Sequence, residues 1–125
     1  MTNYKTTEFG KLAEIITKEN GKIFLKESLG LTGAEISVNC VPKGYKIPFS
    51  HKHVQNEEIY IFLKGEGVFV VDGENLKIKE GSCVRVAPAG ARTLSNTGEE
   101  PLQFICIQAK EGSLEQFGLG DAEIC

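Results

Sequence analysis

HKHVQNEEIYIFLKG, residues 51–65, places a cluster of candidate metal ligands directly before a run of strand-forming residues. It holds both histidines of the chain, two positions apart, and the run EIYIFL that follows is rich in isoleucine and aromatic residues. A run of this length and composition is typical of a buried β-strand. Side chains two positions apart in a strand point to the same face, so His51 and His53 are predicted to face the same way.

Short strand-like segments separated by turn signals lie on both sides of this stretch. They are KIFLKESL, AEISVNCV, GVFVV, NLKIK, SCVRV, RTLSN and PLQFICIQA. Asp72-Gly73 is the strongest hairpin signal, because glycine supplies the positive φ angle that a type I′ turn requires. KLAEIITKEN, residues 11–20, fits either a short strand or one helical turn. With no helix of ten or more residues expected among them, these segments predict an all-β sandwich or barrel.

Length and charge narrow the class of protein. The chain has 125 residues, which suits one domain and is enough to bury a core. The formal net charge of -3 argues against a nucleic-acid partner, since no basic stripe is present to neutralise phosphates. The N-terminus MTNYKTTEFG lacks the apolar core of a signal peptide, and no apolar run approaches the roughly 18 residues of a membrane span. We therefore expect no membrane partner either.

The cysteines indicate a reducing compartment. Cys40, Cys83, Cys106 and Cys125 are widely spaced and form no CxxC pair. This spacing suits a reduced, cytoplasmic chain better than a disulfide scaffold, so we expect four free thiols. Cys106 lies within the apolar segment FICIQ, where a cysteine usually acts as a small hydrophobe. A ligand-binding thiol or a further metal ligand is the alternative for this residue.

His51, His53 and Glu58 form the candidate metal site. Two neutral imidazoles and one carboxylate make a facial set that binds a divalent ion and leaves positions open. If the strand that begins at Glu58 pairs antiparallel with the segment that carries the histidines, the carboxylate returns to their side. The donor atoms suit zinc, iron, nickel or manganese alike. Two solvent-exposed histidines beside a turn are the alternative.

The spacing of these residues resembles the first motif of the cupin superfamily, Gly-x5-His-x-His-x3,4-Glu-x6-Gly. Six residues lie between Gly44 and His51, one more than the motif has. Four residues separate the second histidine from Glu58, and six more lead to Gly65. The last spacing selects Glu58 rather than Glu57 as the motif glutamate.

A second segment, GSCVRVAPAGARTLSN at residues 81–96, resembles the second cupin motif, Gly-x5-Pro-x-Gly-x2-His-x3-Asn. When the segment is aligned on its first glycine and last asparagine, Arg92 stands where the motif has the histidine that usually supplies the fourth ligand. Ala87 and Ala89 stand at the proline and glycine positions. The departure at Arg92 bears directly on the metal site.

The resemblance implies a single-domain jelly-roll β-barrel, the double-stranded β-helix of the cupins, with a metal at its mouth. It covers about residues 36–109, so residues 1–35 are an N-terminal extension and residues 110–125 a C-terminal tail of one domain. Cupins similar to this one generally pair through a sheet, often exchanging N-terminal strands. Because GKIFLKESL, residues 21–29, is expected to be a strand with apolar residues on both faces, we predict a homodimer.

Arg92 leaves two interpretations of the site open. Arginine stays protonated and cannot ligate a cation. In the first interpretation the metal keeps three protein ligands, and Arg92 anchors a carboxylate or phosphate that also reaches the metal. In the second, Arg92 replaces the charge of the metal, and the pocket binds an anion or sugar without one. A solvent-exposed Arg92, with Thr93 facing inward instead, is the remaining arrangement.

Other residues near the ligands are candidates for catalysis or binding. Glu57 and Tyr60 are candidate proton-transfer groups, and Gln55, Phe62 and Cys106 are candidate ligand contacts, with core packing or exposure as the alternatives. Small cupins include sugar isomerases, epimerases, dioxygenases and decarboxylases. The resemblance therefore implies a metal-dependent isomerase, epimerase or dioxygenase acting on a small anionic or sugar-like ligand, or a binding module without catalysis.

Overall fold

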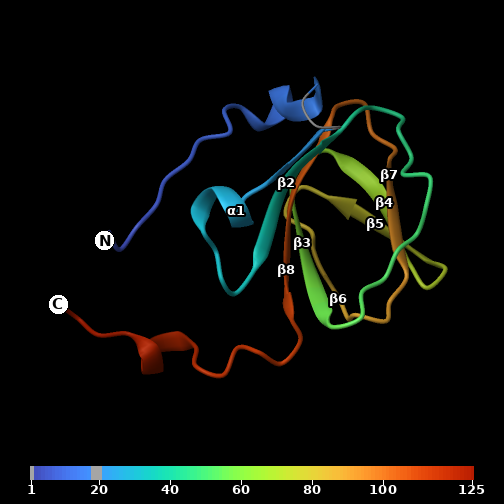
Figure 1. Cartoon of the computed structure of the whole chain (residues 1–125). Coiled ribbons are helices and arrows are strands. Elements are labelled where there is room, and N and C mark those ends of the chain that lie inside the picture. Colours follow the sequence, from blue (N-terminus) through green and yellow to red (C-terminus); the bar gives the residue numbers. More distant parts are fainter. Residues whose placement is uncertain (1, 18–20) are drawn as a thin grey trace.

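The computed structural model describes residues 2–17 and 21–125, and most of the chain forms β-strands (Figure 1). The strands are β1 (Lys22–Phe24), β2 (Glu35–Val41), β3 (Asn56–Lys64), β4 (Glu66–Val71), β5 (Glu74–Lys79), β6 (Cys83–Val86), β7 (Arg92–Asn96) and β8 (Leu102–Lys110). The helices among these residues are short: η1 (Leu12–Thr17), α1 (Lys26–Leu29) and η3 (Gly118–Asp121). None of the described helices has the length and apolar character needed to cross a membrane.

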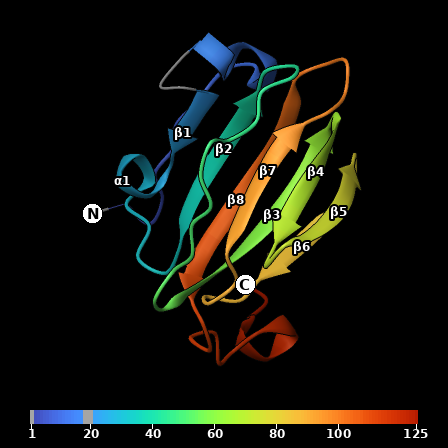
Figure 2. The same cartoon turned by 90° about the vertical axis from the view of Figure 1, so that its right-hand side faces the viewer.

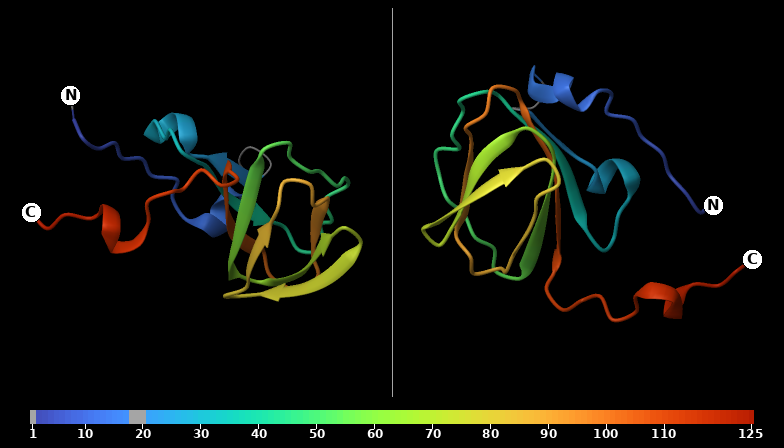
Figure 3. Two further views of the ribbon diagram at one scale, coloured as in Figure 1. Left: turned by 90° about the horizontal axis from the view of Figure 1, so that it is seen from below. Right: turned by 180° about the vertical axis from the view of Figure 1, so that it is seen from behind.

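Two antiparallel sheets enclose one interior (Figures 2 and 3). The larger sheet has the strand order β1-β2-β8-β3-β6, and the smaller sheet has the order β5-β4-β7. Isolated bridges from Lys46 to Ser95 and from His51 to Arg92 add the segment before β3 to the free edge of β7. The predicted all-β jelly-roll barrel is confirmed by this arrangement.

Alternation along the strands fills the barrel. In β3 the buried Tyr60 and Phe62 alternate with the half-buried Ile59 and Ile61. The buried side chains pack against Phe69, which is fully buried in β4, in edge-to-face contacts that suit aromatic rings. The buried members of this inner core are Val41, Tyr60, Phe62, Phe69, Ile78, Val86, Leu94, Leu102, Phe104 and Cys106.

A second apolar cluster lies on the outer face of the larger sheet. Its buried members are Ile15 of η1 and Val38 and Cys40 of β2. Ile23 of β1 packs against them, because it points away from the inner face that its neighbours Lys22 and Phe24 share. The N-terminal segment therefore covers part of the sheet that the barrel leaves outside.

The strand predicted for KIFLKESL is wrong in its second half. The strand ends at Phe24, and α1 follows from Lys26 to Leu29. Lysine, glutamate and leucine favour a helix, and Gly30 ends it in the left-handed conformation with a φ of 67°. In KLAEIITKEN, the helical-turn alternative is found as η1, while residues 18–20 lie outside the described residues.

The predicted hairpin at Asp72-Gly73 is confirmed between β4 and β5. Both residues have positive φ angles, 49° and 84°, as a type I′ turn requires. Asp72 Oδ1 also accepts a hydrogen bond of 2.9 Å from the backbone N–H of Ala91. The turn therefore holds the chain in place immediately before Arg92.

Candidate metal centre and cavity

Two parts of the barrel bring His51, His53 and Glu58 together. Glu58 is buried on the inner face of β3, between β6 and β8. The histidines lie in the segment along β7, where His51 and Arg92 exchange backbone hydrogen bonds of 3.1 and 2.9 Å. The His53 N–H donates to the carbonyl of Pro88 at 2.9 Å. The histidines therefore face Glu58 across the interior of the barrel.

The histidine segment thus does not pair with β3, which was one arrangement that would bring Glu58 to its side. The chain between β2 and β3 crosses to the smaller sheet, because the edge of β7 offers backbone groups that need partners. Both neighbours of β3 are already in place, since β6 and β8 pair with it on either side. The two histidines nevertheless turn to the same side, as their spacing predicts.

The three candidate ligands lie close enough to share one ion. One ligand atom from each residue lies within 4.8 Å of the others. His51 Nε2 is 3.6 Å from Glu58 Oε1, and His53 Nε2 is 3.3 Å from Glu58 Oε2. Two ligand atoms that each bind one ion at about 2.0–2.2 Å lie at a distance from each other that is similar to these two separations.

His53 Nε2 gives an independent test of the fit to a metal. This atom is shielded from solvent and has no hydrogen-bond partner among the described residues. A buried polar atom without a partner costs roughly 1–3 kcal/mol, so folded proteins rarely leave one. The lone pair of a neutral imidazole is a preferred ligand for divalent transition metals. The histidines and Glu58 therefore fit such an ion.

Hydrogen bonds leave one side of the Glu58 carboxylate free. Oε1 accepts from Tyr60 Oη at 2.6 Å and from Arg92 Nη1 at 2.8 Å. Oε2 accepts from the Cys106 thiol at 3.4 Å and faces His53. A carboxylate oxygen has about two lone-pair sites, so Oε2 retains acceptor capacity toward the histidines while both sites of Oε1 are used.

These contacts also set the charge of Glu58. Burial on its own raises the pKa of this carboxyl group, but the hydrogen bonds from Tyr60 and Cys106 and the charges of His53 and Arg92 outweigh it. The pKa of Glu58 is therefore held below its usual value. A carboxylate that stays ionised when buried is available to a cation.

Cys106 and Tyr60 are protonated donors in this arrangement. Burial and the nearby Glu58 raise the pKa of Cys106 to about 12, so the residue is a thiol and not the thiolate that metals bind. Its Sγ does not join the cluster of three ligand atoms, contrary to its predicted alternative as a further ligand. Burial raises the pKa of Tyr60 as well, and its proton is engaged by Glu58.

Arg92 points into the barrel and is 1% exposed, whereas Thr93 donates a 3.3 Å hydrogen bond to the carbonyl of Ile47. The Arg92 Nη1 donates to Glu58, and Nη2 donates to the carbonyl of Ala87 at 2.8 Å. Nε is buried without a partner among the described residues. Each terminal nitrogen thus donates to a protein acceptor, and Arg92 acts here as the counter-ion of Glu58.

Three of the predicted functional residues lie outside this arrangement. Glu57 is on the outer face of β3, where it pairs with Arg85 at 2.9 Å. Gln55 is exposed, and its carbonyl accepts the N–H of Glu111. Phe62 is part of the aromatic core and does not line the cavity beside the ligands. The structure therefore brings neither Glu57 nor these two predicted ligand contacts to the site.

A cavity of about 240 Å³ opens beside the ligands. Tyr60, Cys106, Arg92 and the neighbouring Thr93 line it together with residues that we did not predict, which are Lys22, Phe24, Glu35, Ser37, Ile47, Phe49, Phe69, Leu94, Phe104 and Gln108. The first four belong to β1 and β2. Alternation in the sequence could have placed the two β2 residues on the inner face, since Glu35 and Ser37 flank the outward-facing Ile36.

Comparisons with known proteins agree with this architecture. The sequence pattern of the cupin domain family matches residues 37–108. A cupin protein from Bacteroides fragilis has a crystal structure that is 39% identical, with a TM-score of 0.88 over 100% of this chain and 99% of that one. An uncharacterised protein of Methanocaldococcus jannaschii is 32% identical over 80% of this chain and 82% of its own length.

A more distant relative carries a functional name. The oxalate-binding protein of Thermotoga maritima is 37% identical over 57 residues, which are 46% of this chain and 47% of that protein. The match of the family pattern to most of the barrel, joined to a histidine pair and a glutamate that meet inside a jelly roll, shows that this chain belongs to the cupin family.

Proposed function

We propose that this cupin binds one divalent transition-metal ion through His51, His53 and Glu58 and offers the open positions of the ion to a small carboxylate ligand. The observation that carries the proposal is His53 Nε2, which is buried without a hydrogen-bond partner and lies 3.3 Å from Glu58 Oε2. When bound, such an ion polarises the oxygen atoms of its ligand. Zinc, iron, nickel and manganese all suit these donors.

Charge supports an anionic ligand. Arg92 neutralises the negative charge of Glu58 through a buried hydrogen bond. The two positive charges of a divalent ion are therefore not balanced by Glu58. A carboxylate bound to the ion supplies the missing negative charge in a low-dielectric interior. Oxalate is the first ligand to test, because one relative is named as an oxalate-binding protein.

The geometry supports ligand binding more directly than proton transfer. Glu57 faces away from the cavity, and the proton of Tyr60 is held by Glu58. Binding of an anion or sugar by Arg92 without a metal receives less support, since both terminal nitrogens of Arg92 already have protein acceptors. We therefore place ligand capture at the metal as the proposed function.

Metal and ligand titrations test this function. Protein purified without a nickel column and stripped with a chelator is expected to bind one cobalt ion per chain, and oxalate is expected to change the visible spectrum of that ion. His53→Ala should lose the ion, while Gln55→Ala, a matched change at an exposed neighbour, should keep it. Full occupancy in His53→Ala, or no ion in the wild-type chain, would contradict the proposal.

We also propose that the chain forms a homodimer through the outer face of the larger sheet. Half-buried isoleucines of β2, β3 and β8 form adjoining rows on this face. They are Ile36, Ile59, Ile61 and Ile107, together with Ile105, which also packs against the cluster under η1. Burial of such a continuous apolar face is the usual driving force for a stable interface.

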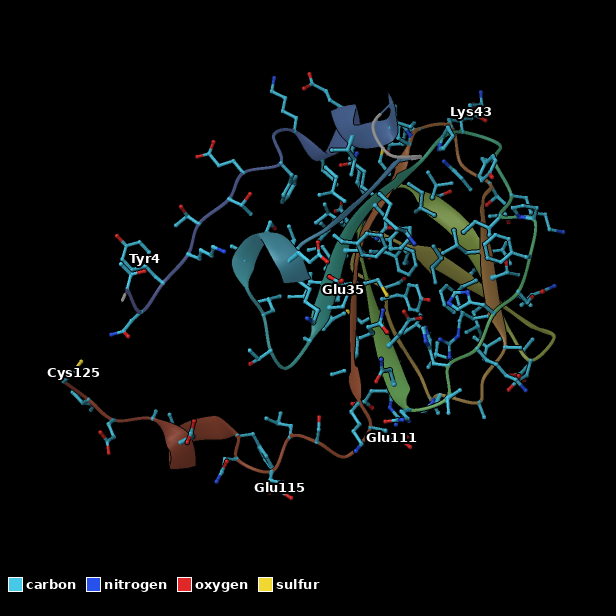
Figure 4. All side chains as sticks on the ribbon, viewed as in Figure 1. Tyr4, Glu35, Lys43, Glu111, Glu115 and Cys125 are labelled. Atoms are coloured by element: carbon cyan, nitrogen blue, oxygen red, sulfur yellow. The ribbon has the colours of Figure 1, made fainter. Side chains whose placement is uncertain are left out.

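The ends of the chain support this pairing. Both extend away from the barrel on the same side (Figures 1 and 4). The C-terminal tail carries apolar side chains that are at least 74% exposed: Leu114, Phe117, Leu119 and Ile124. Apolar groups spread along an extended segment gain burial when a second copy covers them.

A reducing compartment, the cytoplasm, remains the proposed location. All four cysteines are free thiols. Cys83 pairs with Ile61 on the outer face, whereas Cys106 pairs with Tyr60 and points inward, so these two thiols lie on opposite faces of the sheet. A bridge between them would require the strands to rearrange.

A further inference from the structure

We infer that Lys22 recognises a second acidic group of the ligand, so that the cavity takes a small dicarboxylate with one end at the metal and the other at this lysine. The inference rests on the proposed metal-dependent binding of a carboxylate. It adds to that function a residue outside both cupin motifs and a requirement for two separated acidic groups.

Lys22 is the cation of the cavity that is not paired with any carboxylate that the structure describes. Among the described residues, the lysines and arginines that line the cavity are Lys22 and Arg92, and Arg92 is already paired with Glu58 and with the carbonyl of Ala87. Lys22 has no carboxylate within 4.0 Å in the described part of the chain. Its Nζ instead lies 5.7 Å from the centre of the Phe24 ring. An ammonium group over an aromatic ring keeps its charge available to an anion.

The position of Lys22 sets the length of the ligand. Strands β2 and β8 lie between β1, which carries Lys22, and β3, which carries Glu58. Adjacent strands are about 4.8 Å apart, so these two side chains start on well-separated parts of the inner face. Oxalate can chelate the ion with both of its carboxylates. A longer dicarboxylate is needed to reach the lysine as well.

The charges that line the cavity favour a ligand of two negative charges. Lys22 and Arg92 balance Glu35 and Glu58, so the bound divalent ion adds two positive charges to a neutral set. Glu35 lies in β2 (Figure 4), and its Oε1 accepts the backbone N–H of Lys26 at 2.9 Å. A dicarboxylate makes the loaded site neutral, which lowers the cost of charge in a partly buried cavity.

Size and rim chemistry fit the same class of ligand. A volume of about 240 Å³ holds only a small molecule, below the roughly 300 Å³ at which pockets for drug-sized ligands begin. Phe24 and Phe49 line the cavity while they remain 51% and 62% exposed, so they stand at its mouth. Their rings offer apolar contact to the methylene groups between two carboxylates.

Succinate and its monoamide, succinamate, test the inference because they match in length and differ by one charge. Full-length protein loaded with cobalt is titrated with each, and oxalate serves as a probe of the metal alone. We expect the wild-type chain to bind succinate about fivefold more tightly than succinamate, which is the size of an exposed ion pair. Lys22→Met should remove this preference and leave the affinity for oxalate within about twofold, while Lys22→Arg should keep the preference.

Lys26→Met is the matched control, since it removes the same charge from a neighbouring residue that does not line the cavity. The inference is overturned if Lys22→Met keeps the preference for succinate, or if Lys26→Met loses it to the same degree. In both cases cobalt and oxalate still bind, so the proposed function stands. Failure of the wild-type chain to bind cobalt or oxalate overturns the proposed function and the inference with it.

Discussion

The Arg92 guanidinium donates a hydrogen bond of 2.8 Å to Glu58 Oε1 inside the barrel, and the two side chains are 1% and 7% exposed. Glu58 belongs to the larger sheet and Arg92 to the smaller one, so the contact joins the two walls of the barrel. Arg92 stands where related cupin motifs have a further metal ligand. A fixed positive charge therefore occupies a position that could otherwise serve the ion.

Loss of Arg92 is expected to destabilise the metal-free protein. Arg92→Ala leaves the buried charge of Glu58 without its counter-ion and should lower the free energy of unfolding by about 3–5 kcal/mol. Urea titration monitored by circular dichroism measures the change. Adding Glu58→Gln to Arg92→Ala should recover part of the loss, because no unpaired charge then remains. A double variant as unstable as the sum of the single variants would argue against the pairing.

Arg92→His is expected to tighten metal binding. The imidazole supplies a fourth neutral nitrogen, and the ion takes over the role of balancing Glu58. We expect a gain of about tenfold in zinc affinity, or about 1.4 kcal/mol, over Arg92→Gln, which loses the same charge but adds no metal ligand. Competition with a chromophoric chelator measures both affinities. Equal values for the two variants would show that position 92 does not reach the ion.

Acid is expected to weaken both the fold and the metal site. Burial, as the largest effect, lowers the pKa of His51 below 6.5, and the pKa of Glu58 also lies below its usual 4.5. The folded state then binds fewer protons than the unfolded state, so stability is fully present above pH 6.5 and is lost as pH falls through the folded pKa values. Cobalt affinity should also decrease as the pH falls, because a protonated imidazole cannot bind metal.

The measurements for this prediction are urea midpoints of the metal-free chain and cobalt titrations, both between pH 8 and pH 4. Tyr60→Phe removes a hydrogen bond that lowers the pKa of Glu58, so the acid-induced loss of stability that belongs to Glu58 should be smaller in that variant and should end at higher pH. Stability that rises as pH falls below 6.5 would contradict the assigned directions.

A charge on the outer face of the larger sheet is expected to prevent formation of the proposed dimer. Ile107→Lys places an ammonium group between Ile36 and Ile59, where burial of an unpaired charge is costly. Light scattering should give twice the chain mass of 13.7 kDa for the wild type and a value near 13.7 kDa for the variant. Leu76→Lys, on the smaller sheet, is the matched control and should remain dimeric. A monomeric wild-type chain would rule out the proposed interface.

The strands and the candidate ligands could be predicted because their signals are local. The alternation of EIYIFL and the Asp72-Gly73 dipeptide depend on neighbouring residues alone, and both match β3 and its following hairpin. The same alternation places Glu57 on the opposite face from Glu58, and it was sufficient to exclude Glu57 from the cavity. Phe62 shares the face of Glu58, but alternation does not tell how deep in the barrel a side chain lies.

The remaining features depend on contacts between distant segments. The histidine segment pairs with β7, and this choice of edge follows from which strands are already occupied on both sides. The orientation of Arg92 rather than Thr93 toward the interior follows from the same pairing. Lys22 reaches the cavity because β1 pairs with β2. The residues that follow β1 form α1 instead of continuing the predicted strand.

The position of β1 has a consequence for the kinetics of ligand exchange. This strand has three residues and pairs with β2 alone, yet it carries Lys22 and Phe24 on one side and Ile23 on the other. Fraying of so short an edge costs less free energy than global unfolding, whereas β3 is held between two neighbours. We therefore expect opening of β1 to admit and release small molecules at a rate set by the N-terminal packing, while His51, His53 and Glu58 stay in place.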